Sequence, residues 1–506
     1  MKERWFNYRP ICLVFLFLLM GSFFSFYINK NPIIVILVFI VCVAIFMVLA
    51  IARKKLKLFL IPLVAFLVGI TLYNIAIIKY ESNVIQETPE TISARIYSVD
   101  KPTDKSLKLQ ADSVVINGKE IGDNIIIYIT DASRLFENFE IGSKISFSPS
   151  SFYHNDLFYY ETPNANLYSN DLRYTAYARA EDVTHNGVDT TFVEELKAKV
   201  KANLGEELTN ENAEIAYSAI FGEKEMLSEK QYNSMRLSGV AHLMAVSGLH
   251  VGIIVAILLG ILKLLRANKW WKFAIIAIFL LLYAYVCNFA VSVIRASIMA
   301  LMLLLATNVG REYDSFSAIS LAGIVCFLIN PLCAFDVGFL LSFSCVFGIV
   351  IFNKSLNRFL QKYKMSNAIT TSLAMSLSTM LALIFVMAYF FNNFNLISII
   401  ANVIIIPLFT IAFIFVFVVS AISLLIPVIA HVLAPVNYIF DLISIIAKIL
   451  GNLPLANILT IDISYIAIFM YFMLLLLLGR MCTARSKNKV FVTLPIVTLL
   501  VYLLVI

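Results

Sequence analysis

Long apolar windows constrain the fold of this chain more than any other feature of its sequence. Windows of about 20 apolar residues, each long enough to cross the hydrocarbon core of a bilayer, recur along most of its 506 residues. Hydrophobic residues make up 60% of the chain and charged residues only 14%, and a soluble core cannot bury that much apolar surface. The sequence therefore predicts a polytopic α-helical membrane protein.

The apolar windows predict about 13 membrane-spanning helices. No small-residue cleavage site follows the first window, so we expect that window to remain as a helix rather than to be removed as a signal peptide. The window at 396–426 is too long for one straight helix and contains Pro407, which favours a re-entrant hairpin or a broken helix there. The expected spans cover residues 11–28, 33–52, 58–78, 240–262, 273–289, 291–309, 316–331, 337–353, 368–391, 396–426, 428–450, 463–479 and 490–506.

Basic residues in short loops predict which way the chain crosses the membrane. Arg53, Lys54, Lys55 and Lys57 lie between the second and third spans, and the positive-inside bias places them and the N-terminus in the cytoplasm. Counting crossings from that loop puts the other basic clusters on the same side, at residues 263–272, 354–364 and 480–489.

The segment 81–190 has a different pattern and is expected outside the membrane. Between residues 85 and 190, nine Lys and Arg stand against sixteen Asp and Glu, and apolar and polar residues alternate in short runs separated by turn signals such as Asn117-Gly118. About five strands in a segment of this length predict a small β-barrel of the OB type. The expected strands cover residues 91–99, 107–116, 124–130, 144–150 and 174–183.

Two features of this acidic domain bear on its ligands. The stretch between Phe152 and Tyr168 is rich in aromatic residues and is expected to form a long loop. The negative balance argues against a broad basic track for phosphates, whereas local stacking of bases on Tyr or Phe stays open. Residues 191–235, which follow, have mixed charge and apolar positions at helical spacing, and they predict one or two amphipathic helices.

Polar residues gather at the entry of one predicted membrane helix, RLSGVAHLMAVSGLHVG at 236–252. Arg236, His242, Ser247 and His250 lie there, and Gly248 starts a GxxxG pattern suited to close helix crossing. Ionisable groups at membrane depth are costly and usually face a protein-lined or watery interior. We therefore expect a gate or pore entry whose histidines are pathway groups.

Three alternatives to the pore entry stay open. The segment could be a packing helix whose histidines bond to neighbouring backbone. It could also belong to an intramembrane serine hydrolase in which Ser247 is the nucleophile, a role that needs a base oriented by a third group. A transporter of a small anionic or lipid substrate is a third functional class compatible with polar groups at membrane depth.

Other polar positions lie inside apolar runs. Arg295 must snorkel, pair or face water, so it either meets a phosphate or carboxylate or pairs with Asp336, and we hold both alternatives open. Asn402 precedes Pro407, where a freed backbone could line a cavity or simply mark a kink. Two further groups of positions stand out. One span carries Gly338, Ser342 and Ser344, and the next carries a polar stripe formed by Ser372, Ser376 and Thr379.

Several chemistries are absent from the sequence. No Gly-rich loop ending in Lys-Ser or Lys-Thr is present, so we expect no nucleotide hydrolysis. HExxH and CxxC are also missing, and the seven cysteines all fall in or beside predicted spans. The sequence predicts neither an enzyme nor a metal or cofactor site.

At this level of detail the chain resembles the ComEC family of competence proteins, the inner-membrane channels for transforming DNA. The resemblance covers nearly the whole chain, including the leading helices and the predicted OB-like domain. Its motifs are long and occur in the family's order. They are AIFGEKEMLSEKQYNSMRLSG and SGVAHLMAVSGLHVG, then the block from IRASIMALMLLLATNVGREYDSF to FDVGFLLSFSCVFGI, and finally FFNNFNLISIIANVIIIPL.

The resemblance implies a channel that passes single-stranded DNA across the bacterial cytoplasmic membrane during natural transformation. It implies a DNA pathway, with individual roles left open, formed by Arg236, His242, Ser247, Gly248, His250, Arg295, Arg311, Asp336, Gly338, Ser342, Asn402 and Pro407. It also implies a separate outer DNA receptor and a cytoplasmic helicase-like ATPase.

This chain departs from the family pattern at one point. Many members carry a C-terminal metallo-β-lactamase-like domain, and no HxHxDH metal motif occurs here, so we expect the nuclease to be another protein. The expected organisation is N-terminal transmembrane helices (1–80), the OB-like domain (81–190), an amphipathic linker (191–235), a channel core (236–426) and C-terminal transmembrane helices (427–506).

Overall fold

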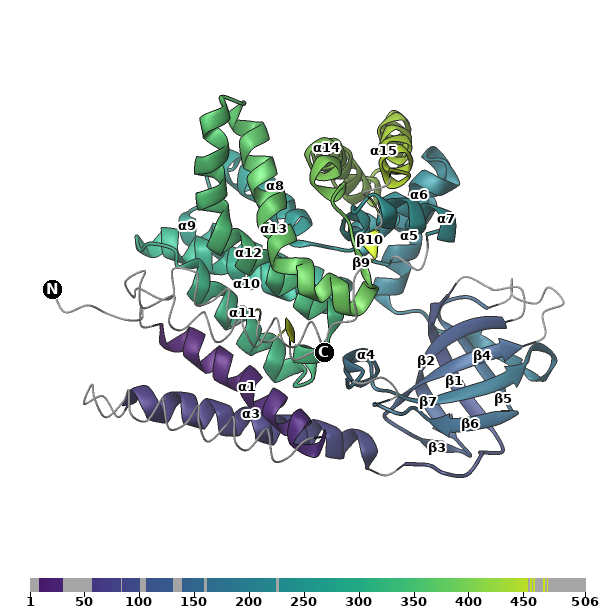
Figure 1. Ribbon diagram of the computed structural model, residues 1–506. Coiled ribbons are helices and arrows are strands. Elements are labelled where there is room, and N and C mark those ends of the chain that lie inside the picture. The colour runs from purple at the N-terminus through teal and green to yellow at the C-terminus, as the bar shows by residue number, and fades with distance from the viewer. Residues whose placement is uncertain are drawn as a thin grey trace. The chain divides into compact units, whose positions relative to one another are not determined.

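The computed structural model describes residues 9–30, 57–82, 84–100, 106–130, 139–158, 162–223 and 227–453, with a few more between 456 and 471. The chain forms two compact units, whose elements are labelled in Figure 1. The first unit contains the described parts of residues 1–15, 204–325 and 337–506, and the second those of residues 16–203 and 326–336.

Apolar helices make up most of the described chain, and seven of them are long and apolar enough to cross a membrane. A helix suits this role because it satisfies its own backbone hydrogen bonds in lipid. They are α1 (Pro10–Lys30), α3 (Lys57–Glu81), α9 (Lys269–Val286), α10 (Val291–Val309), α12 (Val337–Leu360), α13 (Asn367–Phe391) and α14 (Ser398–Ser423).

Shorter or bent elements account for several of the other expected spans. The 3-10 segment η7 (Pro427–Leu433) and α15 (Val436–Gly451) are bent by 40° and add an eighth span if the pair counts as one. Two shorter apolar helices are α8 (Gly248–Leu264) and α11 (Ser315–Ile329). The polytopic helical fold is confirmed, but about 13 spans are not. The spans predicted at 33–52 and 490–506, and nearly all of 463–479, lie outside the described residues.

The expectation of a break at Pro407 was wrong. The helix α14 continues through Pro407 without interruption. The proline is exposed on the surface of the helix, where the missing N–H bond is tolerated within a long apolar run. The break lies in the next predicted span instead, where Pro427 starts η7 and Pro435 precedes α15.

Glycines set the closest helix contacts in each unit. A side chain at Gly348 of α12 would overlap the carbonyl oxygen of Ser378 in α13 and lie 2.7 Å from Ala382 Cβ. In the second unit, a side chain at Gly69 of α3 would overlap the carbonyl of Leu18 in α1. Backbones approach this closely only where a small residue leaves room.

The second unit contains a mixed sheet in which β3 pairs with β2 and the other strands follow the order β6-β7-β4-β2-β1-β5-β8. Neighbouring strands are antiparallel except for β4 and β7, which run parallel. The strands are β1 (Ile92–Val99), β2 (Ser106–Ile116), β3 (Lys119–Glu120), β4 (Asn124–Thr130), β5 (Ser143–Phe147), β6 (Ser151–His154), β7 (Leu172–Arg179) and β8 (Thr184–Val188).

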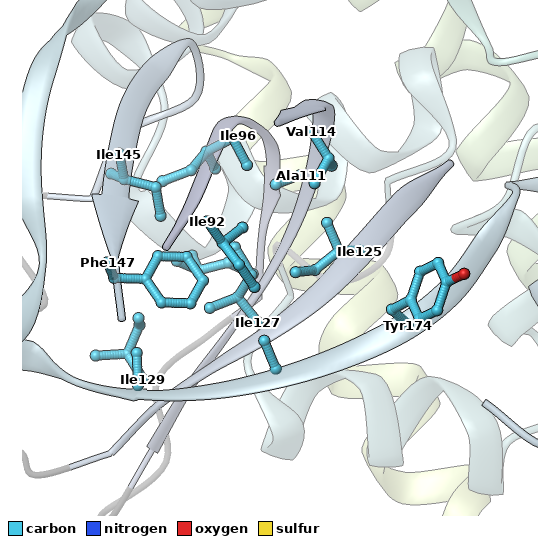
Figure 2. Close-up of a cluster of buried hydrophobic side chains, with 14 of the residues drawn as sticks. Ile92, Ile96, Ala111, Val114, Ile125, Ile127, Ile129, Ile145, Phe147 and Tyr174 are labelled. Atoms are coloured by element: carbon cyan, nitrogen blue, oxygen red, sulfur yellow. The ribbon is translucent and has the colours of Figure 1, made fainter. Parts of the chain in front are cut away.

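The chain connection between β5 and β6 makes this sheet curl. These two strands lie toward opposite ends of the strand order, yet only residues 148–150 separate them. Such a connection spans roughly 14 Å at full stretch, so the two sides of the sheet must come together. The enclosed face carries the core, and Figure 2 shows Ile92, Ile127 and Phe147 from different strands lying close together there.

Local sequence explains most of the β domain. Strict alternation buries Ile125, Ile127 and Ile129 on the core face of β4. All five predicted strands are present, and Asn117 and Gly118 both adopt positive φ in the turn between β2 and β3.

Two expectations about loops and linkers need correction. The stretch from Phe152 to Tyr168 is not simply a long loop, because Phe152 belongs to β6 and the helix α4 (Ala165–Ser169) begins after the capping residue Asn164. The predicted one or two amphipathic helices before the membrane region are three, α5 (Phe192–Glu207), α6 (Asn210–Phe221) and α7 (Glu229–Leu237).

Candidate functional site

The polar segment 236–252 contains a tight turn between two helices. The helix α7 ends at Leu237, a 3-10 turn covers Ala241–Leu243, and α8 starts only at Gly248. Gly239 adopts φ +81°, and a side chain there would also overlap Ser398 of α14. The predicted span at 240–262 therefore starts too early, because this turn requires backbone geometry that only glycine adopts easily.

Ser247 and His250 form a capping box at the start of α8. Ser247 is the N-cap, and its Oγ accepts a bond from Leu249 N at 3.3 Å. The Nδ1 of His250 accepts the Ser247 N–H at 3.1 Å and lies 2.9 Å from Ser247 Oγ. Both side chains thus satisfy backbone and polar groups at the helix entry, which otherwise stay unpaired.

The ring of His250 packs against an aromatic pair on α14. Its ring centroid lies 5.4 Å from that of Phe409 and 4.5 Å from that of Phe413, with both rings near perpendicular to the imidazole. Its Nε2 is buried without a hydrogen-bond partner in the described chain. His250 therefore joins the start of α8 to the middle of α14.

The helix α10 completes the cluster. Arg295 is 6% exposed, and its Nη1 donates to the backbone oxygen of Ser342 in α12. A side chain at Gly248 would lie 3.0 Å from Arg295 Nη2, so glycine leaves room for the guanidinium beside the start of α8. Ser292 Oγ donates to the oxygen of Val246 at 2.5 Å. The segment before α8 is thus held by groups from α10.

The structure brings together part of the predicted pathway set. Ser247, Gly248, His250, Arg295 and Ser342 meet within the first unit through the contacts above. Asn402 is half-buried on α14 with an Oδ1 that bonds to no described group, and it lies seven residues before Phe409, hence on the same helix face.

The remaining predicted residues lie on other parts of these elements, and of them His242 is close enough to His250 for an electrostatic interaction. Arg236 and His242 are exposed on the same segment, and Gly338 and Pro407 are exposed on their helices. Arg311 follows the far end of α10, about 24 Å along the axis from Arg295. Asp336 belongs to the second unit, and its pairing with Arg295 stays a prediction.

One member of the polar stripe on α13 has a local explanation. Thr379 Oγ1 donates to Ser376 O at 2.9 Å, within the helix. Ser378, which is not part of the stripe, also bonds within the helix, to Ala374 O at 2.6 Å. A hydroxyl bonded within its own helix does not require a pore.

Sequence reasoning missed Phe409 and Phe413. They lie more than a hundred residues after His250, and their spacing of four on an apolar helix is typical of ordinary packing, so no local signal marks them.

The chemistry available at the cluster is limited. No group of three metal-binding side chains occurs among the residues that the structure describes. The Ser247–His250 contact has the length of a nucleophile–base pair, but the imidazole packs against Phe409 and Phe413, and its second nitrogen bonds to no orienting carboxylate in the described chain. The arrangement supports positioning of helices better than covalent catalysis.

Fold and site together define a polytopic membrane protein in which a buried polar cluster fixes the entry of one apolar helix beside two others. Residues 219–485, which contain this cluster, match the model of the family described as Competence protein. That match covers more than half of the chain, and the chain belongs to this family.

The chain is also similar to a characterised relative. It is 29% identical over 285 residues to ComE operon protein 3 of Bacillus subtilis. The match covers 55% of this chain and 35% of the relative, so the similarity spans about a third of that protein's length. No solved structure matches the chain at a significant level.

Proposed function

We propose that this protein is the channel through which single-stranded DNA crosses the cytoplasmic membrane during natural transformation. The observation that carries the proposal is the family match over residues 219–485, within which the half-buried Ser247 and the buried His250 and Arg295 lie in one cluster. Charged and polar groups at membrane depth are costly, and they are usual where a polar solute passes.

The site residues divide into two roles under this proposal. Arg236 and His242 are exposed and would face the passing strand, where the guanidinium of Arg236 can meet a phosphate. His250, Arg295 and Gly248 are packed against neighbouring helices and would hold the shape of the entry. Asn402 supplies a further polar group on α14. Ser342, Arg311, Asp336, Gly338 and Pro407 remain proposed members of the pathway, without assigned roles.

We further propose that the β domain is a barrel of the OB type. The consecutive strands β1, β2 and β4 pair in order, β4 lies parallel to β7, and β1 also pairs with β5. If β5 and β6 count as one interrupted strand, this strand closes the circuit by pairing with both β1 and β7. A five-stranded Greek-key barrel with such a circuit is the OB architecture.

The proposed organisation keeps the five segments expected from the sequence, with the N-terminus in the cytoplasm and the β domain outside. Transport would be driven elsewhere, because the sequence carries no phosphate-binding loop. A helicase-like ATPase in the cytoplasm, a DNA receptor outside and a separate nuclease are the proposed partners.

The test is DNA entry in the host organism. Deletion of the gene should abolish entry of fluorescently labelled DNA into the cytoplasm, while surface binding of that DNA persists. Restoring the wild-type gene should restore entry, and Arg236→Ala or His242→Ala should reduce it by about tenfold each, since each removes a polar contact worth roughly 1–2 kcal/mol. Unchanged entry after deletion would refute the channel.

A second candidate, an intramembrane serine hydrolase, is favoured by the 2.9 Å separation of Ser247 Oγ and His250 Nδ1. Treatment of membranes with a serine-reactive phosphonate discriminates between the two functions. Covalent modification of Ser247, lost in Ser247→Ala, would support the hydrolase. Absence of labelling together with lost DNA entry on deletion would support the channel.

A further inference from the structure

Three tyrosines form a ladder on the outer face of the β domain. The rings of Tyr128 on β4 and Tyr177 on β7 are stacked with centroids 5.1 Å apart and planes 16° from parallel. Tyr153 on β6 follows on the other side of Tyr177, with centroids 6.2 Å apart and hydroxyl oxygens 3.5 Å apart. The ladder thus crosses three neighbouring strands.

Strand register explains why the ladder faces outward. Tyr128 pairs directly with Tyr177 across the parallel β4–β7 ladder, and each lies between core residues of its own strand. Their neighbours Ile127, Ile129, Ala176 and Ala178 are fully buried in the core. Because side chains alternate along a strand, the tyrosines must point away from that core.

The ladder is accessible at the β6 end. Tyr153 is 47% exposed although it is a large aromatic side chain, and Tyr128 and Tyr177 are half-buried by their contact with one another. Cross-strand aromatic pairs stabilise sheets, which accounts for the Tyr128–Tyr177 pair. It does not account for the third ring, which is left open to the surroundings.

Two cations flank the ladder. Lys108 on β2 is the register partner of Tyr128, and Arg179 lies two residues after Tyr177 on the same face of β7. Each has an acidic neighbour, since Lys108 Nζ lies 2.9 Å from Asp100 and Arg179 Nη1 lies 3.8 Å from Glu181. The surface therefore combines three aromatic rings with two cations whose charge is partly neutralised by acidic neighbours. The domain as a whole is acidic.

We propose that Tyr153, Tyr177 and Tyr128 form a stacking platform for bases of single-stranded DNA, with Lys108 and Arg179 beside the strand's phosphates. The proposal rests on the proposed function for the choice of DNA as ligand. Stacking on aromatic rings accepts any base and needs bases that are not already paired. The platform therefore binds a separated strand, whatever its sequence, and not a duplex.

The charge pattern gives this platform a distinctive salt dependence. Binding to single strands weakens with salt with a slope of about −0.7 for each phosphate neutralised. With two flanking cations the slope of log affinity against log salt is about −1.4 at most. A protein that grips DNA along a basic track has a much steeper slope.

The test uses the purified full-length protein in lipid nanodiscs and a fluorescein-labelled oligothymidylate, followed by fluorescence anisotropy. Tyr153→Leu/Tyr177→Leu should weaken binding by about tenfold or more, because it removes two rings. Tyr153→Phe/Tyr177→Phe is the matched control, and it should bind within about twofold of wild type because it keeps the rings. The wild-type salt slope should be shallow.

The single variant Tyr153→Leu, on the exposed strand β6, distinguishes loss of stacking from misfolding of the double variant. It should also weaken binding, with an unchanged elution profile in size-exclusion chromatography. Equal affinity of the Leu variants and wild type would overturn the platform. So would an equal loss in the Phe variant, or a slope steeper than about −3.

Failure of the platform is distinguishable from failure of the proposed function. If the Leu variants bind the oligonucleotide like wild type while deletion of the gene still abolishes entry of labelled DNA, the channel stands and the platform is wrong. If deletion leaves entry intact, the proposed function itself is wrong.

Discussion

At the scale of single residues, the Ser247–His250 capping box is the feature on which the candidate site depends. An N-cap hydroxyl that bonds the first turn of a helix contributes about 1 kcal/mol. Histidine replaces the usual Glu or Gln at the third helical position, and its ring also packs on Phe409 and Phe413. One side chain therefore serves both the cap and the contact with α14.

Ser247→Ala should lower the free energy of unfolding by about 1 kcal/mol, because the cap bonds to Leu249 N and to His250 are lost. Ser247→Thr should retain most of the stability, since threonine is also an N-cap residue. The measurement is the midpoint of denaturant unfolding in mixed micelles, followed by tryptophan fluorescence.

Ser234→Ala is the matched control for this prediction. Ser234 Oγ donates to Lys230 O within α7, and alanine favours helix, so the midpoint should hardly change. If Ser247→Ala unfolded like wild type yet abolished activity in membranes, the hydroxyl would have a chemical role instead of a capping role.

The sequence pattern predicted that segment 236–252 is polar, but it did not predict where the helix α8 starts or which helices the segment contacts. Ser247 and His250 are three apart, so their proximity follows from any helix. The helix start at Gly248 was missed because a histidine does not complete the usual capping signature. Contacts with α14 and α10 join residues far apart in sequence, and a single sequence without its fold carries no signal for them.

At the scale of elements, α12 packs closely on α13 around Gly348. The position of Gly348 leaves no room for a side chain, since a Cβ there would lie 2.7 Å from Ala382 Cβ and overlap Ser378 O. The backbone oxygen cannot move aside without separating the two helices. Ser378, whose hydroxyl bonds within α13 to Ala374 O, lies at the same contact.

Gly348→Ala should destabilise the protein by about 1–3 kcal/mol, the usual cost of overpacking. Gly260→Ala in α8 is the matched control, because a Cβ there meets nothing within 4 Å, and a helical alanine should be neutral or stabilising by about 0.5–1 kcal/mol. Thermal unfolding of both purified variants in the same detergent tests the pair. A Gly348→Ala variant as stable as Gly260→Ala would contradict the packing argument.

Element prediction succeeded where one pattern decided the structure. The strands β1, β2 and β4 alternate apolar and polar residues and were predicted. The strand β8 has the polar sequence THNGV and is exposed throughout, so only its pairing with β5 reveals it. Pro407 was taken as a break because local chemistry disfavours it in helices, whereas the long apolar helix tolerates it.

At the scale of the whole molecule, the described helices bear on the proposed orientation. Lys269 Nζ donates to Asn308 O at 2.8 Å, and Asn308 Nδ2 donates to Lys269 O at 3.1 Å. The start of α9 and the end of α10 therefore lie on the same side of the bundle. Arg311 follows Asn308 by three residues, so it joins the basic cluster at 263–272, as the positive-inside bias requires of a cytoplasmic face.

This orientation predicts which positions a membrane-impermeant maleimide reaches in intact cells. In a variant whose seven cysteines are replaced by serine, Val188→Cys in the β domain, 66% exposed as valine, should be labelled directly. Leu265→Cys, after α8 and 69% exposed as leucine, should be labelled only after permeabilisation. Tyr363→Cys, after α12 and 63% exposed as tyrosine, is a second inside position because an even number of crossings separates it from Leu265 in the proposed order.

Two other results have different meanings. Equal labelling of Val188→Cys, Leu265→Cys and Tyr363→Cys in intact cells would show that the maleimide had entered the cells, and the experiment would be repeated at a lower maleimide concentration. Labelling of Leu265→Cys and Tyr363→Cys without Val188→Cys would invert the topology and place Arg236 and His242 at the wrong end of the pathway.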